Sequence, residues 1–244
     1  MNTAQTIREA VAEVERLREE SRLVPSIGTA VVRLKRFQAR RFAGTYADLL
    51  SSADYAAATR FFLEELYSDR DYGERDAQFA RIAGAVEKLF PKDVAQTASA
   101  LAQLHALTES LDHAMARIEA MDGHDDIAGY LRAWRTVDRR QDRVRQLERV
   151  VAIGAEMIRL TRLPGLRTML RMMRGPASAA GMGSLQRFLE SGFDTFGAMA
   201  RQRGAAERFL QLIQEREQRL VDLLFDADAV ACETELQRIL GQAR

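Results

Sequence analysis

The amino-acid composition predicts an all-α fold, a compact multi-helix bundle of roughly eight to ten helices. Residues with high helix propensity, Ala, Leu, Glu, Gln and Arg, dominate the 244 residues, and only 4 are proline. Strings rich in Val, Ile, Thr and Tyr, which favour strands, are absent from the sequence. Apolar residues recur instead at spacings of three and four, as on one face of a helix.

Turn and capping residues divide the first half of the chain into five expected helices. Pro25 and Pro91 each end a helical pattern, because proline disfavours helical backbone in the residue before it. Ser51 and Asp54 have the spacing of a capping box and start a new helix. The expected helices are residues 6–21, 26–50, 53–67, 73–90 and 93–121.

In the second half of the chain, glycine residues mark most of the expected helix boundaries. A long helix is expected over 127–161, and Pro164 suits the first turn of a short helix to about Met173. The segment 175–183 reads as a loose connection, and Gly204 separates two further helices. These helices are expected over 184–203 and to about Phe225, and a short terminal helix follows Asp228.

Length and patterning favour one helical domain over residues 1–244, with sub-bundles 1–122 and 123–244 as the alternative. No repeat recurs at 30 to 50 residues, which disfavours a solenoid. The near-heptad helix at 93–121 should pack lengthwise on a partner. The sequence leaves open whether that partner lies in the same chain or in a second copy, as in a homodimer.

Charge, hydropathy and cysteine content predict a cytoplasmic protein. The start of the chain resembles no secretory signal, and no window approaches 18 apolar residues without charge. Cys232 is the only cysteine, which fits a reducing compartment and a structural role. Its acidic neighbours, such as Asp228 and Glu233, should raise the pKa of its thiol. A net charge of +1 gives no overall attraction to nucleic acid, and no nucleic-acid partner is expected.

Three side chains at helical spacing, His105, Glu109 and His113, form the best candidate for a metal site. A di-iron site in a helical bundle, however, needs Glu-x-x-His units, and none occurs in the sequence. We therefore expect this face to be surface or hydrogen-bonded, with no metal and no cofactor. No phosphate-binding loop, dinucleotide fingerprint or nucleophile elbow is present in the sequence either, so whether the chain is an enzyme stays open.

A seven-residue run, Phe61-Phe62-Leu63-Glu64-Glu65-Leu66-Tyr67, resembles the signature of the bacterial FFLEELY-motif proteins, letter for letter. The resemblance implies a bacterial origin and a shared fold, and it transfers no catalytic role because that family has no assigned activity. At helical spacing Phe62 and Leu66 can enter the core, and Glu64 can pair with Arg60. We expect a packing motif, with a ligand site as the alternative.

The segment from Met157 to Leu189 contains six arginines and no acidic residue. Arg167, Arg171 and Arg174 lie on one helical stripe, where they could bind an anionic group together. Their basic, methionine-rich surroundings suit an anionic membrane surface or an acidic protein partner. The alternative is neutralisation by the chain's own carboxylates.

Two functions are compatible with these patterns. The first is a non-enzymatic helical adaptor whose Met/Phe/Arg-rich region, residues 157–199, contacts a protein or an anionic surface. The second is a helical-bundle enzyme or carrier whose arginines receive the anionic head group of an apolar ligand. In this case the apolar pocket would be lined by Phe188, Phe193, Phe196 and Met199.

Overall fold

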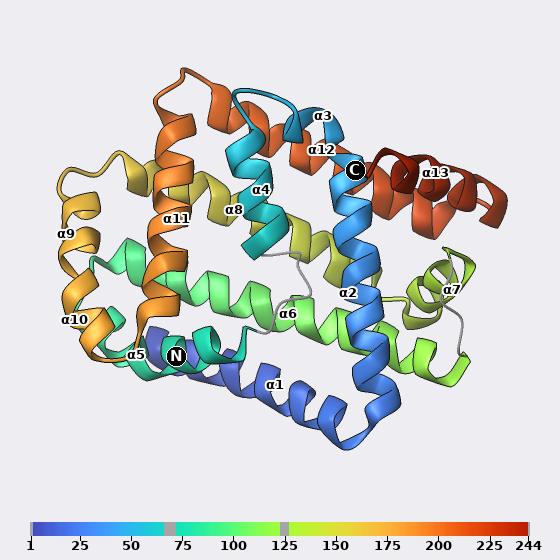
Figure 1. Cartoon of the computed structure of the whole chain (residues 1–244), viewed down its shortest axis with the longest axis horizontal. Helices are drawn as coiled ribbons and strands as arrows, with labels where there is room; N and C mark the ends of the chain where they lie inside the picture. Colours follow the sequence, from blue (N-terminus) through green and yellow to red (C-terminus); the bar gives the residue numbers. More distant parts are fainter. Residues whose placement is uncertain (1, 66–71, 123–126, 244) are drawn as a thin grey trace. The chain divides into compact units, whose positions relative to one another are not determined.

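The computed structural model describes residues 2–65, 72–122 and 127–243 (Figure 1). Within these ranges every regular element is an α-helix, which confirms the all-α prediction. The helices run from α1 to α13, more than the eight to ten expected. Within each helix the backbone N–H and C=O groups bond to one another. The helices are then held together by the apolar side chains that each of them buries on one face.

The helices have the following bounds in chain order. They are α1 (Thr3–Leu23), α2 (Pro25–Thr45), α3 (Ala47–Leu50), α4 (Ala56–Glu65), α5 (Gly73–Leu89), α6 (Lys92–Asp122), α7 (Ile127–Val137), α8 (Arg140–Thr161), α9 (Leu166–Met172), α10 (Arg174–Ala179), α11 (Gly183–Ala200), α12 (Ala205–Asp226) and α13 (Ala229–Gln242).

Breaks that the sequence pattern did not predict account for the additional helices. The expected helix over 26–50 is divided at Tyr46, which has φ −116° and ψ 23°. The expected helix over 127–161 is divided near Asp138, whose positive φ of 47° is a left-handed conformation that Asp tolerates better than most residues. The segment expected as a loose connection contains α10, so that the number of helices was underestimated.

The helix that carries the seven-residue motif begins at Ala56 rather than near Ala53 and is described to Glu65. Leu66 and Tyr67 lie outside the described residues. Phe62 is buried and Phe61 is half-buried, with the two rings in a T-shaped, edge-to-face arrangement at 6.4 Å between centroids. Phe62 therefore packs as expected of a core residue at this spacing.

Contacts between Cα atoms divide the chain into two units. Unit 1 comprises residues 1–15, 70–106 and 149–211, and unit 2 comprises residues 16–69, 107–148 and 212–244. Both units therefore draw on segments before and after residue 122. The helices α1, α6, α8 and α12 contribute residues to each unit.

Unit 1 has a core of small and aromatic side chains. Its buried members are Ala4, Ile7, Ala10, Phe79, Ala83, Ala102 and Leu185. A buried glutamine fixes the start of α11 against α5, because Oε1 of Gln78 accepts a hydrogen bond from the backbone N–H of Leu185 at 2.9 Å. This bond satisfies one of the donors that the first turn of a helix leaves free.

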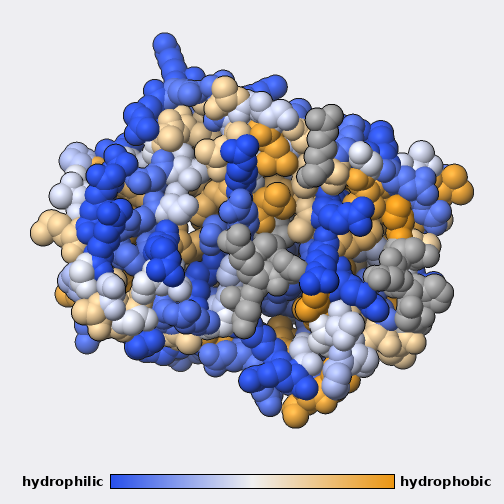
Figure 2. Space-filling view, in the orientation of Figure 1, coloured by the Kyte–Doolittle hydropathy of each residue, from blue (hydrophilic) through white to orange (hydrophobic). Residues whose placement is uncertain are grey.

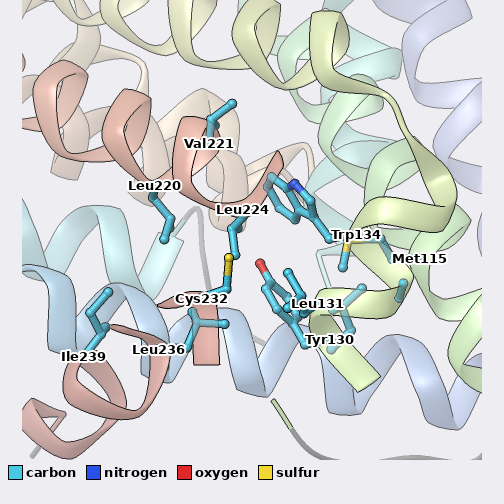
Figure 3. Close-up of a cluster of buried hydrophobic side chains, with 12 residues drawn as sticks. Met115, Tyr130, Leu131, Trp134, Leu220, Val221, Leu224, Cys232, Leu236 and Ile239 are labelled. Carbon is cyan, nitrogen blue, oxygen red and sulfur yellow. The ribbon is translucent and has the colours of Figure 1, made fainter. Parts of the chain in front are cut away.

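Unit 2 has a larger core in which α7, α12 and α13 meet (Figure 3). The ring of Tyr130 stacks on Phe37 at 4.3 Å between centroids and tilts against Trp134 at 5.9 Å. Helix α13 packs on α2 and α7, as Figure 1 also shows. The contact with α2 is close at Gly44, where a Cβ atom would lie 1.9 Å from the carbonyl oxygen of Ile239.

Polar side chains cover much of the surface in view, with apolar patches between them (Figure 2). In the part of the chain that the structure describes, no helix combines the length and the apolar character needed to cross a membrane.

Candidate functional site

A surface pocket of about 1150 Å³ lies within unit 2. Its walls come from α2, α3, α4, α12 and α13, which are distant in the sequence. The described lining residues are Ala43, Gly44, Thr45, Ala47, Asp48, Leu50, Ser51, Arg60, Leu63, Glu64, Arg216, Arg219, Leu220, Leu223, Glu235, Arg238, Ile239, Gly241 and Gln242.

Aliphatic side chains form the floor of the pocket. Leu220 and Ile239 are buried and belong to the core of unit 2, and Leu50, Leu63 and Leu223 are half-buried. The floor is thus continuous with the core, which holds it in place. Water in contact with such a surface can be displaced favourably by an apolar group of a ligand.

Two of the four arginines among the described lining residues are held by carboxylates. Arg216 donates two hydrogen bonds of 2.7 Å to Asp48 and one of 2.9 Å to the carbonyl oxygen of Thr45. Arg238 donates two of 2.7 Å to Glu235. The hydrogen bonds from arginine lower the pKa of both Asp48 and Glu235, so both carboxylates are fixed negative charges at neutral pH.

The other two arginines, Arg60 on α4 and Arg219 on α12, are exposed. Neither makes a hydrogen bond or an ion pair within the described ranges, although the charge of Arg219 contributes to lowering the pKa of Glu235. The pair expected between Arg60 and Glu64 is therefore not formed there, although both side chains line the pocket. Two guanidinium groups beside an aliphatic floor can bind an anion that carries an apolar part.

A buried cluster supports the wall that carries Arg216. Glu217, the next residue of α12, accepts hydrogen bonds from Arg41 at 2.6 Å and from the hydroxyl of Tyr46 at 2.9 Å. The guanidinium of Arg216 lies 5.5 Å from the centroid of the Tyr46 ring. These contacts tie α12 to the junction of α2 and α3 and so fix the wall of the pocket.

Unit 2 also contains a buried set of charged groups between α2, α6 and α8. Lys35 contacts Glu109 at 2.6 Å, Gln38 donates to Asp112 at 3.0 Å, and Arg143 lies 4.0 Å from Asp112. Burial raises the pKa of Asp112 in spite of its cationic neighbours. We assign this set to the interior of the unit, because its members satisfy one another.

The three side chains of the candidate metal face have separate partners. His105 lies in unit 1, where its Nε2 is 2.9 Å from Asp76. In unit 2, Glu109 binds Lys35, and Nε2 of His113 lies 3.7 Å from Glu20. Burial lowers the pKa of His113. Among the described residues, no three His, Cys, Asp or Glu side chains are grouped so as to hold a metal ion.

The arginines of the acid-free segment pair with carboxylates of unit 1. Arg167 and Arg171 contact Asp194 of α11 at 2.8 and 3.9 Å, and Arg174 donates to both oxygens of Glu190 at 2.7 Å. The bond from Arg174 lowers the pKa of Glu190. Neutralisation by the chain's own carboxylates is thus present, although the three arginines stay about half exposed.

The four apolar residues proposed as a pocket lie along α11. Phe193, Phe196 and Met199 are buried, and Phe188 is half-buried beside the core of unit 1. The guanidinium of Arg75 lies 4.4 Å from the centroid of the Phe188 ring, a cation–π geometry. These side chains therefore occupy the interior of unit 1 and its edge.

Cys232 is buried in the core of unit 2 (Figure 3). Its thiol donates to the carbonyl oxygen of Leu223 at 3.1 Å and accepts from Arg135 at 3.4 Å. The pKa of the thiol is raised, as expected, but burial is the main cause, whereas Arg135 lowers it. This arrangement is that of an unreactive, structural cysteine.

The pocket was missed in the sequence because its charged residues come from four helices, α3, α4, α12 and α13. Within the motif, Leu63 and Glu64 line it, but Arg216, Arg219 and Arg238 lie more than 150 residues further along the chain. The available signals were charged side chains at helical spacing, such as Arg216 with Arg219 and Arg60 with Glu64, but spacing within one helix could not bring these pairs together.

Neither the curated proteins nor the solved structures include a significant match to this chain. A family model matches residues 17–231, a range that includes Arg60 and Arg219 of the pocket. The chain therefore belongs to the family described as "Domain of unknown function (DUF8198)".

Proposed function

We propose that the chain is a non-enzymatic binding protein and that the pocket of unit 2 is its binding site. One observation carries the proposal: two exposed arginines, which make no hydrogen bond or ion pair in the described part of the chain, line a pocket together with aliphatic side chains. Arginines in such a position usually bind a carboxylate or a phosphate. The aliphatic floor would add affinity through apolar burial.

The charges of the pocket favour binding over catalysis. Asp48 and Glu235 are each held by two hydrogen bonds from an arginine, and both have a lowered pKa. A general acid or base works best with a pKa near the working pH. These carboxylates act instead as fixed charges that position Arg216 and Arg238.

The pocket supports a carrier or adaptor better than the arginines of unit 1 do. Arg167, Arg171 and Arg174 already have carboxylate partners, so an acidic protein or an anionic membrane would have to compete with Asp194 and Glu190. We retain that surface as a secondary site for long-range attraction of anions. The proposed compartment is the cytoplasm, where a lone buried cysteine stays reduced.

We also propose that the segment resembling the FFLEELY signature has two roles. Phe62 anchors α4 in the core, while Leu63 and Glu64 face the pocket. A bacterial origin is part of the same proposal and rests on the resemblance alone.

Native mass spectrometry of the freshly purified chain tests the binding function. We expect an additional mass, either a small molecule or a protein. The variant Ala47→Trp, which places a large ring in the pocket, should lose this mass, and Ala198→Trp, at an exposed position of α11, should keep it. An additional mass that both variants retain equally would place the binding site elsewhere.

A further inference from the structure

The charges of the pocket restrict the charge of its ligand. The described lining contains four arginines and three carboxylates, which leaves a single excess positive charge. A polyanion would be repelled by Asp48, Glu64 and Glu235, because like charges at close range disfavour one another. A neutral ligand would leave the guanidinium groups of Arg60 and Arg219 without a carboxylate to which they donate hydrogen bonds. A single negative charge matches the described part of the lining.

Two arginines of the pocket already bind carboxylates of the chain itself, which indicates the kind of anion that suits the other two. Arg216 and Arg238 each hold a carboxylate through two parallel hydrogen bonds. This fork geometry is the one that guanidinium and carboxylate groups prefer. Arg60 and Arg219 have the same chemistry and no such partner within the described ranges. A carboxylate supplied by a ligand would complete the pattern.

The floor indicates what the carboxylate is attached to. The described side chains that could contact an apolar ligand are those of leucine, isoleucine and alanine, with no aromatic ring among them. An aliphatic chain packs on such a surface without the ring stacking that aromatic ligands use. The volume of about 1150 Å³ lies slightly above the range of about 300 to 1,000 Å³ that is usual for ligand pockets, so there is room for an extended chain.

We infer that the pocket of unit 2 binds a monocarboxylate with an aliphatic chain. Arg60 and Arg219 receive the carboxylate, and Leu63, Leu223 and Ile239 contact the chain. This inference rests on the binding function proposed above and adds the chemical class of the ligand.

Methyl NMR tests this inference. The full chain carries labelled isoleucine methyl groups and is titrated with dodecanoate, whose concentration stays below that at which it forms micelles. The methyl resonance of Ile239 should shift during the titration, while that of Ile153, in unit 1, should not. Dodecanol, which has the same chain without the charge, should bind at least about tenfold more weakly, because it leaves the two arginines unpaired.

Two double variants distinguish an effect of the pocket arginines on binding from an effect of the chain's net charge. Arg60→Gln with Arg219→Gln should weaken dodecanoate binding about tenfold or more and leave dodecanol binding unchanged. Arg201→Gln with Arg203→Gln removes the same charge at exposed positions of unit 1 and should leave both affinities unchanged. Circular dichroism confirms that each variant stays folded.

The possible failures are distinguishable. Equal binding of dodecanol and dodecanoate, with no effect of the Arg60 and Arg219 substitutions, overturns the carboxylate while leaving a binding pocket. A resonance of Ile239 that dodecanoate does not move overturns the ligand class. In that case the Ala47→Trp comparison by native mass spectrometry still decides, separately, whether the pocket binds anything.

Discussion

Gly44 shows how a single hydrogen atom can determine a helix contact. Its position on α2 faces the backbone of α13, and any side chain there would overlap the carbonyl oxygen of Ile239. Both residues also line the pocket, so the close approach of the two helices sets the width of the site. The requirement is one of space rather than of backbone conformation, because Gly44 lies within α2.

Gly44→Ala should therefore destabilise the chain by roughly 1 to 3 kcal/mol, the usual cost of overpacking. The control is Gly241→Ala in α13, where nothing lies within 4 Å of the added Cβ atom. This change should be neutral or stabilising by up to about 1 kcal/mol, because alanine favours helix. Urea unfolding of both variants measures the difference, and equal stabilities would contradict the close contact.

The motif on α4 gives a second prediction at the residue scale. Phe62 is 3% exposed, so that Phe62→Ala should cost roughly 3 to 5 kcal/mol. Glu64 is exposed at the pocket, and Glu64→Gln should change stability by about 1 kcal/mol or less. Thermal and urea unfolding measure both changes. Unchanged stability in the Phe62 variant would show that this ring is not an anchor of α4.

At the scale of elements, breaks made by proline, glycine and capping residues could be predicted, whereas the breaks at Tyr46 and Asp138 could not. Pro25 opens α2, and Gly204, with φ 77°, stands directly before α12. The breaks at Tyr46 and Asp138 depend on where each helix packs, because neither residue type is a strong helix breaker. Their positions follow from tertiary contacts such as the bond of Tyr46 to Glu217.

The candidate site could be predicted only in part, for the same reason. Short-range spacing identified the motif and the acid-free segment, but it could not pair Arg167 with Asp194 or Arg216 with Asp48. Such pairs depend on how helices distant in sequence are placed together. The hydrogen bond expected on the histidine face is present at His105, but its partner, Asp76 of α5, could not be identified from spacing within one helix.

The ion pairs between α9, α10 and α11 give a prediction about anion binding. Asp194→Asn with Glu190→Gln should free Arg167, Arg171 and Arg174 and increase binding to anionic vesicles. Added salt should weaken this binding, because exposed charges are screened over about 8 Å at 0.15 M ionic strength. Vesicle sedimentation measures it, with neutral vesicles as the control. If the double variant binds no better than the parent chain, this surface does not attract anions.

At the scale of the whole molecule, buried charge links stability to pH. Asp112 is buried, and burial raises the pKa of its carboxyl group above the ordinary value of 3.8. The folded chain therefore holds this proton over a pH range in which the unfolded chain has lost it. The free energy of unfolding is therefore highest, with respect to this group, at acid pH. It falls as pH rises from the ordinary pKa of the unfolded chain to the raised pKa of the folded chain.

Asp112→Asn, which resembles the protonated form, should become more stable relative to the parent chain as pH rises from about 4 towards neutrality. Asp226→Asn should show the opposite trend in a more acid range, becoming less stable relative to the parent chain as pH rises towards about 4, because Arg140 lowers the pKa of Asp226 below its ordinary value of 3.8. Urea unfolding at several pH values measures both differences. A difference for Asp112→Asn that falls as pH rises would contradict the raised pKa.

The central claim is that the pocket of unit 2 is occupied when the chain performs its function. The most direct measurement is an electron-density map of the chain, purified without added ligand and then crystallised with dodecanoate. The account predicts continuous density over Leu223 and Ile239 that ends between the guanidinium groups of Arg60 and Arg219. A pocket that holds only water, or in which both arginines turn away to pair with carboxylates of the chain, would contradict it.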